Sequence, residues 1–453
     1  MNSALSNAAR AMNGELSGND REFVGVSTDT RTLHSGELFF ALSGPNFDGA
    51  EFVSQASEKG AAGVVIEALV DEAVTQIRVD DTRVALGRLG SAWRAQQPAT
   101  VIGVTGSNGK TTLKEMIAAI LQTTAPTLAT AGNLNNDIGM PLMLMRIEAS
   151  HRFAVIEMGA NHQGEIAYLA NLAAPDVVVI SNAGPSHLEG FGSLDGVARG
   201  KGEILQGEPA PRVAVLNADD HYIDYWLSIA GDARVIQFGL QESADVYASD
   251  IAPGTDSATF ALNIAGETVA VTLPLAGIHN VRNACAAAAV AHALGIDSDH
   301  IRQGLEGLEP VSGRLQAISG QSGATVFDDS YNANPGSVQA AGEFLATLPG
   351  ETWLVLGDMF ELGDEAENLH ARLGETLADC GIDRLFTLGD LSKHTAAAFG
   401  KQGEAFQSVD KLSAALLNDL HNAVTVLVKG SRGMRMERVV EAIAAHDSAG
   451  QEN

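Results

Sequence analysis

The stretch Thr100-Val-Ile-Gly-Val-Thr-Gly-Ser-Asn-Gly-Lys-Thr-Thr112 joins a short apolar strand to a glycine-rich loop and the start of a helix. Apolar residues continue at helical spacing from residue 113 to residue 121. In this context the loop N–H groups can surround phosphate oxygens, and the positive end of the helix dipole adds to the attraction. The sequence therefore predicts a phosphate-binding loop made of Thr105, Gly106, Ser107, Asn108, Gly109, Lys110, Thr111 and Thr112.

Two side chains of this loop carry the chemistry of a P-loop. We expect Lys110 to reach the β- and γ-phosphates of a nucleotide and the Thr111 hydroxyl to bind Mg²⁺. The loop is a shortened variant, because the strict GxxxxGK[ST] pattern needs a glycine where Val104 stands. The alternative is a glycine-rich turn with a surface lysine. The pattern GxGxxG is absent, which disfavours a dinucleotide enzyme.

Strand and helix patterns alternate downstream of this loop. Apolar strands are expected at residues 153–156, 177–180 and 213–216, with helical segments between them. This alternation favours a mostly parallel sheet covered on both faces. Between about residues 243 and 274 the period changes to two, which predicts an attached antiparallel hairpin. An alanine-rich helix is expected from Asn283 to Leu294, and we predict a central P-loop domain over residues 98–310.

Weaker α/β patterns lie on either side of the central domain. Residues 1–97 mix short strands with helical spacing, which indicates a small mixed α/β domain. Residues 311–453 again alternate strands and helices, which predicts a Rossmann-like α/β domain of ordinary size. The predicted fold is therefore a three-domain α/β protein.

The chain is strongly acidic. Its 453 residues include 28 Lys and Arg against 56 Asp and Glu, a formal net charge of −28. Such a surface repels phosphate backbones and anionic lipids, so we expect neither nucleic-acid binding nor membrane insertion. The two cysteines lack metal-binding spacing and fit a reducing compartment, and no targeting segment is visible. We predict a cytoplasmic protein, with a monomer as the default.

Three residues outside the loop are candidates for a metal site. Glu157 follows an apolar strand, where a carboxylate beside a phosphate loop can hold Mg²⁺. The alternative interpretation is that Glu157 is an acidic residue at the end of a strand whose side chain faces solvent. His187 follows the next strand, and Lys201 comes 14 residues later. Without further context, these two read as a loop histidine and a solvated lysine at a helix start.

Taken together, the motifs resemble the Mur ligases, the ATP-dependent amide-forming enzymes of peptidoglycan precursor synthesis. The resemblance covers nearly the whole chain, in the order of the family's pattern. It rests on the phosphate loop, Glu157-Met-Gly, the His187 and Lys201 pair, Gly277-Ile-His-Asn-Val-Arg-Asn283, Gly313-Arg314 and Asp328-Asp-Ser-Tyr-Asn-Ala-Asn-Pro335.

Within the family, three features of the sequence indicate the greatest similarity to the ligase that adds a D-alanyl dipeptide. The segment Ser27 to Ala41 resembles the uridine-nucleotide domain of the two later ligases. The Asp-Asn-Pro-Arg signature of the diaminopimelate-adding ligase is absent. The segments 132–139, 331–335 and 356–363 resemble the dipeptide-adding member. The resemblance implies that the protein joins D-alanyl-D-alanine to UDP-N-acetylmuramoyl-tripeptide through an acyl phosphate.

The resemblance also implies roles for individual residues. Lys110, Lys201 and Arg314 would be catalytic, with Arg314 directed at the γ-phosphate. Two Mg²⁺ ions would be held by Thr111, Glu157, His187 and Lys201, the lysine as an N6-carboxylated carbamate. Asn280 and Asn283 would lie near the adenine of ATP, and Asp329 near its ribose. We expect His279 to serve in packing. The expected substrate-binding residues are Ser27, Thr28, Asp29, Arg31, Asn135, Asn136, Asn332, Asn334, Lys429 and Arg432.

Several alternatives remain open at this point. The segment Lys429 to Arg432 also reads as a helix N-terminal turn with solvated charges. Related enzymes are the diaminopimelate-adding ligase and folylpolyglutamate synthase, both disfavoured by the motifs above. A P-loop regulatory or transport ATPase would hydrolyse ATP without an amino-acid acceptor. A non-enzymatic nucleotide-binding module would tolerate loss of Glu157 and Lys201.

Overall fold

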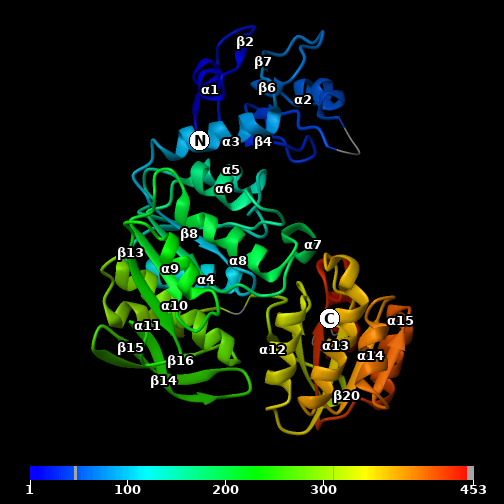
Figure 1. Cartoon of the computed structure of the whole chain (residues 1–453). Coiled ribbons are helices and arrows are strands. Elements are labelled where there is room, and N and C mark those ends of the chain that lie inside the picture. Colours follow the sequence, from blue (N-terminus) through cyan, green and yellow to red (C-terminus); the bar gives the residue numbers. More distant parts are fainter. Residues whose placement is uncertain (45–47, 310, 446–453) are drawn as a thin grey trace, which may run out of the picture.

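The computed structural model describes residues 1–44, 48–309 and 311–445, and it contains three α/β units that follow one another along the chain (Figure 1). Each unit is built on its own sheet, and one further two-stranded pairing lies near the N-terminus. The predicted fold class is therefore confirmed. Residues 310 and 446–453, which include a predicted domain boundary and the predicted C-terminal end, lie outside the described residues. Among the described residues, no helix combines the length and apolarity that a membrane crossing needs.

The N-terminal unit is a small mixed sheet with helices. Its strand order is β2-β7-β6-β5-β4, and only β2 runs antiparallel to its neighbour. Asp81 caps the N-terminus of the long helix of this unit, and its carboxylate accepts hydrogen bonds from the backbone N–H groups of Arg83 and Val84. Its elements are β1 Ser3–Ala4, α1 Leu5–Met12, β2 Glu15–Ser17, β3 Glu22–Phe23, β4 Val26–Ser27, β5 Leu38–Phe40, α2 Val53–Glu58, β6 Gly63–Ile66, β7 Gln76–Arg78 and α3 Thr82–Arg94.

The central unit is a nine-stranded sheet with helices on both faces. Its strand order is β16-β15-β14-β13-β12-β11-β8-β10-β9, parallel from β9 to β14 and antiparallel from β14 to β16. Its elements are β8 Thr100–Thr105, α4 Lys110–Gln122, β9 Thr127–Ala129, α5 Gly139–Leu144, β10 Phe153–Glu157, α6 Glu165–Ala173, β11 Val177–Ile180, α7 Leu188–Phe191, α8 Leu194–Gly202, β12 Val213–Asn217, α9 Ile223–Ile229, β13 Arg234–Gly239, β14 Val246–Pro253, β15 Ala258–Ile264, β16 Glu267–Leu273, α10 Ile278–Ala293 and α11 Ser298–Glu306.

Two apolar layers stabilise this central sheet, one on each face. The layer that includes Leu113 and Val290 lies under α4, α10 and α11, and the layer that includes Ile166 and Trp226 lies under α6, α8 and α9. The predicted hairpin does form, but its strands continue the main sheet because β14 pairs with β13. The alanine-rich helix begins at Ile278, five residues before its predicted start, because apolar periodicity does not mark the polar first turn.

The C-terminal unit is a six-stranded sheet in the order β17-β18-β22-β19-β20-β21, with only β17 antiparallel. Asn334 starts helix α12 with a capping box, and Pro335 occupies its first turn. Its elements are β17 Gln316–Ser319, β18 Thr325–Asp329, α12 Pro335–Leu345, β19 Glu351–Gly357, α13 Ala366–Asp379, β20 Arg384–Leu388, α14 Lys393–Phe399, β21 Gly403–Phe406, α15 Val409–Asp419, β22 Val424–Lys429 and α16 Glu437–Ile443.

The strand order decides where functional side chains gather. Strand β8, which feeds the phosphate loop, lies between β10 and β11. Because these strands are parallel, the loop, Glu157 and the segment leading to His187 all emerge at the same sheet edge. Strands β18 and β22 of the C-terminal unit are likewise parallel neighbours and end at Asp329 and Lys429. Ligands of open parallel sheets bind at such carboxyl ends.

Candidate active site

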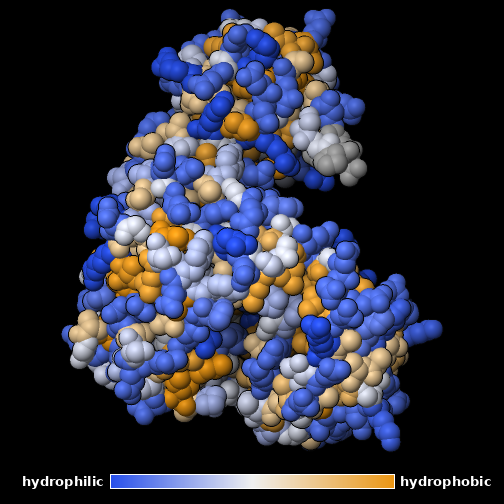
Figure 2. Space-filling model, viewed as in Figure 1, coloured by the Kyte–Doolittle hydropathy of each residue, from blue (hydrophilic) through white to orange (hydrophobic). Residues whose placement is uncertain are grey.

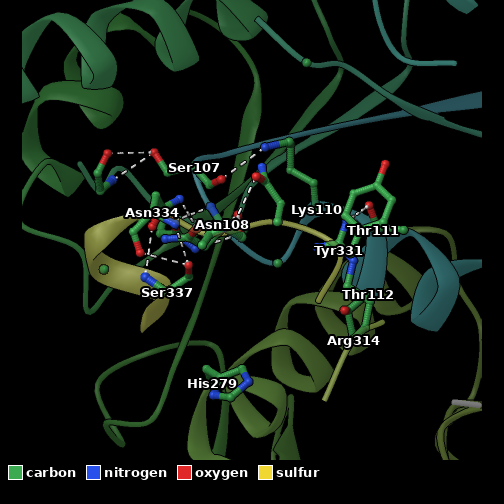
Figure 3. Close-up of a pocket in the computed structure, with 18 of the residues that line it drawn as sticks. Ser107, Asn108, Lys110, Thr111, Thr112, His279, Arg314, Tyr331, Asn334 and Ser337 are labelled. Atoms are coloured by element: carbon green, nitrogen blue, oxygen red, sulfur yellow. Dashed lines mark hydrogen bonds between the residues drawn. The ribbon is translucent and has the colours of Figure 1, made fainter. Parts of the chain in front are cut away.

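A cavity of about 610 Å³ lies between the central and C-terminal units. Figure 3 shows the phosphate loop on one side of it and residues of the C-terminal unit close by. The sequence-predicted residues that line this cavity are Ser107, Asn108, Gly109, Lys110, Thr111, Thr112, Asn135, Asn136, Glu157, His187, Asn280, Asn283, Arg314, Asp329, Asn332, Asn334 and Lys429. The predicted residues that do not line it are Ser27, Thr28, Asp29, Arg31, Thr105, Gly106, Lys201 and Arg432.

The phosphate loop has a backbone that only glycine permits at two positions. Gly106 has φ +147°, and a Cβ atom there would lie 2.0 Å from the Ser181 hydroxyl. Gly109 has φ +77°, and its Cβ would lie 2.9 Å from the side chain of Asn283. The loop is therefore packed closely against the β11 end and against helix α10. A side chain at either glycine would not fit, and a backbone without Cβ atoms can approach a phosphate closely.

Lys110 folds back over its own loop. Its ammonium group donates hydrogen bonds to the carbonyl oxygens of Gly106 at 2.7 Å and Ser107 at 3.1 Å. Burial lowers the pKa of this ammonium group, the nearby Glu157 carboxylate opposes that shift, and Arg314 adds to it. A phosphate in the loop would replace the carbonyl partners with a stronger, charged one.

Arg314 approaches the phosphate loop from the C-terminal unit. Its guanidinium group donates to the Thr111 hydroxyl at 3.1 Å and lies 4.2 Å from the centre of the Tyr331 ring (Figure 3). Stacking on the ring holds the guanidinium plane in place while its remaining N–H groups stay available. The arrangement brings two cations, Lys110 and Arg314, to the same end of the cavity.

Glu157 is the last residue of β10 and is only 2% exposed. The alternative interpretation, that this side chain faces solvent, is therefore wrong. Its Oε1 accepts a hydrogen bond from the Asn135 amide at 2.7 Å, whereas its Oε2 is buried without a hydrogen-bond partner in the described part of the chain. A buried carboxylate oxygen without a partner is costly unless a ligand satisfies it. Together with the Thr111 hydroxyl, this oxygen suits Mg²⁺, which needs only one or two carboxylates besides phosphates and water.

No cluster of three or more His, Cys, Asp or Glu side chains suited to a metal occurs among residues 1–44, 48–309 and 311–445. A metal at this site would therefore depend on Glu157, on the Thr111 hydroxyl and on oxygen ligands from the nucleotide. His187 lies at the same cavity with φ +51°, and its Nδ1 contacts Oε2 of Glu361 in the C-terminal unit. A histidine in this sparsely populated backbone region is typical of functional sites.

Lys201 lies in the last turn of α8 and is fully buried, so its reading as a solvated lysine at a helix start is wrong. Its Nζ lies 3.4 Å from the Ala160 carbonyl oxygen and 5.0 Å from the centre of the Phe191 ring. Within the described residues it forms no ion pair. Burial, assisted by the charge of Lys110, lowers the pKa of Lys201 to about 7. The side chain lies behind Ala160, which lines the cavity, and does not itself reach the surface of the cavity.

The C-terminal unit supplies the opposite wall of the cavity. The Asn334 amide donates to the Asn108 side chain at 2.7 Å and so joins α12 to the phosphate loop (Figure 3). Lys429 pairs with Asp329 at 2.6 Å, and both side chains are largely buried. The reading of residues 429–432 as a turn with solvated charges is therefore wrong for Lys429. The pair leaves the cavity wall electrically balanced at this point.

His279 belongs to the cavity wall, contrary to the expectation that it serves in packing. Burial lowers its pKa to about 4, so the ring is neutral at physiological pH. Figure 3 shows it apart from the phosphate loop. The sequence signal that would have assigned it is its place in the first turn of α10, beside Asn280 and one turn from Asn283.

The predicted uridine-binding residues lie in the N-terminal unit. Asp29 accepts hydrogen bonds from Arg31, which lower the pKa of the Asp29 carboxyl to about 2. Lys59 donates to the Thr30 carbonyl oxygen at 2.6 Å, which ties this turn to α2. Figure 2 shows the surface hollowed between the N-terminal unit at the top and the C-terminal unit at the lower right.

His370 anchors the loop that follows β19. Its Nδ1 donates to the Ala366 carbonyl oxygen at 2.7 Å, and its Nε2 accepts from the Met359 N–H at 3.1 Å. This pattern needs a neutral ring, and burial lowers the pKa of His370 accordingly. The loop that it holds presents Phe360 and Glu361 to the interface with the central unit.

We expect His370→Leu to lower the free energy of unfolding by about 1–3 kcal/mol, because the buried Met359 N–H loses its partner and the part-buried Ala366 carbonyl oxygen loses the imidazole donor. Because the native pKa is lowered, the contribution of the neutral ring is complete above the ordinary value of 6.5. It is lost as the pH falls from there through the native pKa. Urea unfolding midpoints at pH 7.5 and pH 5 measure both effects. A difference between wild type and variant that is the same at both pH values contradicts the assignment, and His34→Leu is the exposed control.

Comparison with known proteins agrees with this geometry over nearly the whole chain. Three domain families match in succession: the Mur ligase family catalytic domain at residues 22–94, the Mur ligase middle domain at residues 104–291, and the Mur ligase, glutamate ligase domain at residues 313–432.

Individual relatives match at similar length. The UDP-N-acetylmuramoyl-tripeptide--D-alanyl-D-alanine ligase of Escherichia coli is 44% identical, over 97% of this chain and 98% of that protein. A crystal structure of MurF from Acinetobacter baumannii has a TM-score of 0.93 at 37% identity and covers 97% of this chain and 98% of that one. The MurF ligase of Thermotoga maritima, solved in complex with ADP, has a TM-score of 0.82 at 28% identity, covering 92% of this chain and 96% of that one. By domain matches, sequence identity and fold, this chain belongs to the Mur ligase family.

Proposed function

We propose that the protein is an ATP-dependent ligase that joins D-alanyl-D-alanine to UDP-N-acetylmuramoyl-tripeptide and forms a peptide bond. One observation carries the proposal: the phosphate loop faces Arg314, Asp329 and Lys429 of the C-terminal unit across a single cavity. Such a site can activate a carboxylate with ATP on one side and admit an amine on the other. Full-length relatives with this activity in their names support the same reading.

ATP would occupy the main cavity with its phosphates on residues 105–112. The adenine would lie near Asn280 and Asn283, both on α10, with His279 as a neutral neighbour. Asp329, held by Lys429, would accept hydrogen bonds from the ribose hydroxyls. The ADP complex of the Thermotoga maritima relative supports nucleotide binding on this fold.

Two Mg²⁺ ions would complete the phosphate site. The first would be held by the Thr111 hydroxyl and by the unpartnered Oε2 of Glu157. His187 and a carboxylated Lys201 would hold the second. When bound, the ions neutralise phosphate charge and stabilise the charge that develops during phosphoryl transfer.

Carboxylation of Lys201 fits the surroundings of this side chain. The amine is buried, has no acidic partner among the described residues and has a pKa lowered to about 7. A neutral amine adds to CO₂, and the product carries oxygen ligands and a negative charge. The change from cation to anion removes the repulsion between Lys201 and a metal ion or Lys110.

The reaction would proceed in two chemical stages. The terminal carboxylate of the tripeptide attacks the γ-phosphorus, ADP departs, and an acyl phosphate forms. The dipeptide amine then attacks the acyl carbon and loses a proton, and phosphate departs with its bonding electron pair. Lys110 and Arg314 hold the phosphoryl oxygens in line throughout, which is the main contribution a protein makes to phosphoryl transfer.

The three units would divide the substrates between them. Residues 1–97 would bind the uridine nucleotide through Ser27, Thr28, Asp29 and Arg31, and residues 98–310 would bind ATP and, through Asn135 and Asn136, the peptide. Residues 311–453 would receive the dipeptide, using Asn332, Asn334, Lys429 and Arg432. We propose that the protein acts as a monomer. The nucleotide substrates and the two free cysteines support a cytoplasmic location.

The experiment is phosphate release from ATP in the presence of UDP-N-acetylmuramoyl-tripeptide, with and without D-alanyl-D-alanine. We expect release that requires both substrates and matches the gain in product mass. Release that is independent of both would overturn the ligase proposal in favour of a regulatory ATPase. Release only with free diaminopimelate and the UDP-linked dipeptide would overturn the proposed substrates and identify an earlier step of the same synthesis.

A further inference from the structure

Lys114 is a buried cation that the proposed reaction does not use. It lies on α4, one turn after Lys110, and its side chain is 2% exposed. The ammonium group donates a hydrogen bond to the Thr130 carbonyl oxygen at 2.7 Å and pairs with the Glu115 carboxylate. Removing an ammonium group from water is costly, and well-packed apolar side chains often stabilise a protein at least as well as a buried ion pair. Packing alone therefore does not explain a charge at this position.

Thr130 is held from three sides at the point where the chain leaves β9. Lys114 donates to its carbonyl oxygen, its own N–H donates to the Val155 carbonyl oxygen at 3.0 Å, and its hydroxyl accepts the Glu157 N–H at 2.9 Å. Thr130 is 1% exposed, so bulk water cannot replace any of these partners. Lys114 therefore fixes Thr130, and Thr130 in turn contacts the backbone of the candidate metal ligand.

The segment 130–136 contacts Glu157 a second time through Asn135. The side-chain amide of Asn135 donates to Oε1 of Glu157 at 2.7 Å, and its carbonyl oxygen accepts the Gly159 N–H at 2.9 Å. A Cβ atom at Gly159 would lie 3.1 Å from the Asn135 side chain, so the two segments are in close contact. Because this amide holds Oε1, the oxygen left without a partner among the described residues is Oε2. The segment therefore decides which carboxylate oxygen is available to a metal ion.

We propose that Lys114 is a positioning residue, which fixes segment 130–136 against α4 and thereby directs the unpartnered Oε2 of Glu157 at the metal ion. The inference rests on the proposed function and extends it to a residue that does not line the main cavity. Helix α4 would then fix both protein ligands of this ion, since Thr111 lies in its first turn and Glu157 is reached through Lys114. Mg²⁺ demands near-ideal ligand geometry, so the groups that orient its ligands also affect its binding.

The same segment also faces the proposed binding site of the peptide. Asn133, Asn135 and Asn136 all line the main cavity. At this end the segment has its own anchor, because the Asn136 side chain accepts the N–H of Gly139, the first residue of α5, at 2.8 Å. Loss of Lys114 would therefore loosen the segment at its β9 end. We expect the change to weaken binding of the metal ion and of the UDP-linked tripeptide, but not binding of the dipeptide.

The first test measures Mn²⁺ binding to the full-length protein in the presence of ADP by electron paramagnetic resonance. We expect Lys114→Met to raise the dissociation constant for Mn²⁺ about tenfold, because loss of groups that orient metal ligands weakens metal sites to this extent. The control is Leu121→Ala, which removes a fully buried side chain from the last turn of the same helix. It should lower the melting temperature but leave the dissociation constant within about twofold, because the two sites are independent. Equal dissociation constants in wild type and Lys114→Met overturn the proposal.

The second test asks whether Lys114 acts through Asn135. Asn135→Ala should weaken Mn²⁺ binding by itself, and adding Lys114→Met should then cause less than about twofold further loss, because both changes interrupt the same path. Losses that multiply in the double variant contradict the proposal. If Lys114→Met does not fold, Thr130→Val interrupts the path between Lys114 and Glu157 instead. It should also raise the dissociation constant about tenfold, and an unchanged value would count against the proposal in the same way.

Steady-state ligation separates this inference from the proposed function. In Lys114→Met the KM for the UDP-linked tripeptide should rise about fivefold or more, whereas the KM for D-alanyl-D-alanine should stay within about twofold. Failure of wild type to ligate the dipeptide would overturn the proposed function and this inference together. Normal ligation by wild type, with an equal rise in both KM values of the variant or with no rise in either, would overturn only the role of Lys114.

Discussion

Replacing Lys110 with methionine is expected to reduce kcat/KM for dipeptide ligation by about 10³-fold or more. The substitution keeps the approximate length of the side chain but removes the cation that lies over the phosphate loop, where it donates to the carbonyl oxygens of Gly106 and Ser107. Loss of one preorganised charged donor at a transferring phosphoryl group has effects of this size. Coupled measurement of phosphate release and product mass gives the ratio.

The matched control is Lys401→Met, which removes an exposed lysine of the C-terminal unit that does not line the cavity. Its activity should equal that of wild type, and both variants should show the circular dichroism of the folded protein. A folded Lys110→Met enzyme that retains more than a tenth of the wild-type kcat/KM would contradict the role of Lys110 in phosphoryl transfer.

Lys201→Ala is expected to abolish nearly all ligation and to regain part of it when formate, acetate or propionate is added. The alanine leaves a space behind Ala160 in which a small carboxylate can supply the oxygens of the missing carbamate. Wild-type activity should also increase with bicarbonate, most clearly as the pH rises through about 7, because only the neutral amine adds to CO₂. Initial rates across pH and carboxylate concentration measure both effects.

Lys114→Ala is a matched control, since Lys114 is also buried but already has the Glu115 carboxylate and the Thr130 carbonyl oxygen as partners. We expect this variant to be less stable and to gain nothing from added carboxylates. If carboxylates restore no activity to Lys201→Ala and bicarbonate does not affect wild type, the carbamate is excluded and Lys201 acts only as a buried amine.

Much of the fold could be predicted because its strands are continuous apolar runs in the sequence. Residues 100–105, 153–157 and 177–180 are buried on both faces of a parallel sheet, so each reads as a strand without knowledge of its neighbours. The predictions were wrong at the ends of elements, such as the early start of α10. At these positions hydrogen bonds and caps, rather than apolar spacing, determine where a helix begins.

The surroundings of the candidate residues were harder to predict. The sequence suggested that Lys201 is solvated, but α8 packs it beneath Phe191, which changes both its charge state and its chemistry. His279 was expected in packing but lines the main cavity. In each case burial depends on segments that are distant in the chain, and local spacing contains no information about them.

The sequence by itself determined the α/β class, the order of the three units, the phosphate loop and the presence of residue types suited to phosphate and Mg²⁺, because these depend on local periodicity and on side-chain chemistry. Only the tertiary structure decided which of these residues meet. His187 and Glu361 are 174 residues apart yet touch, and Arg314 reaches Thr111 from another unit. Strand order and packing between units create such contacts, and through them the cavity between the central and C-terminal units.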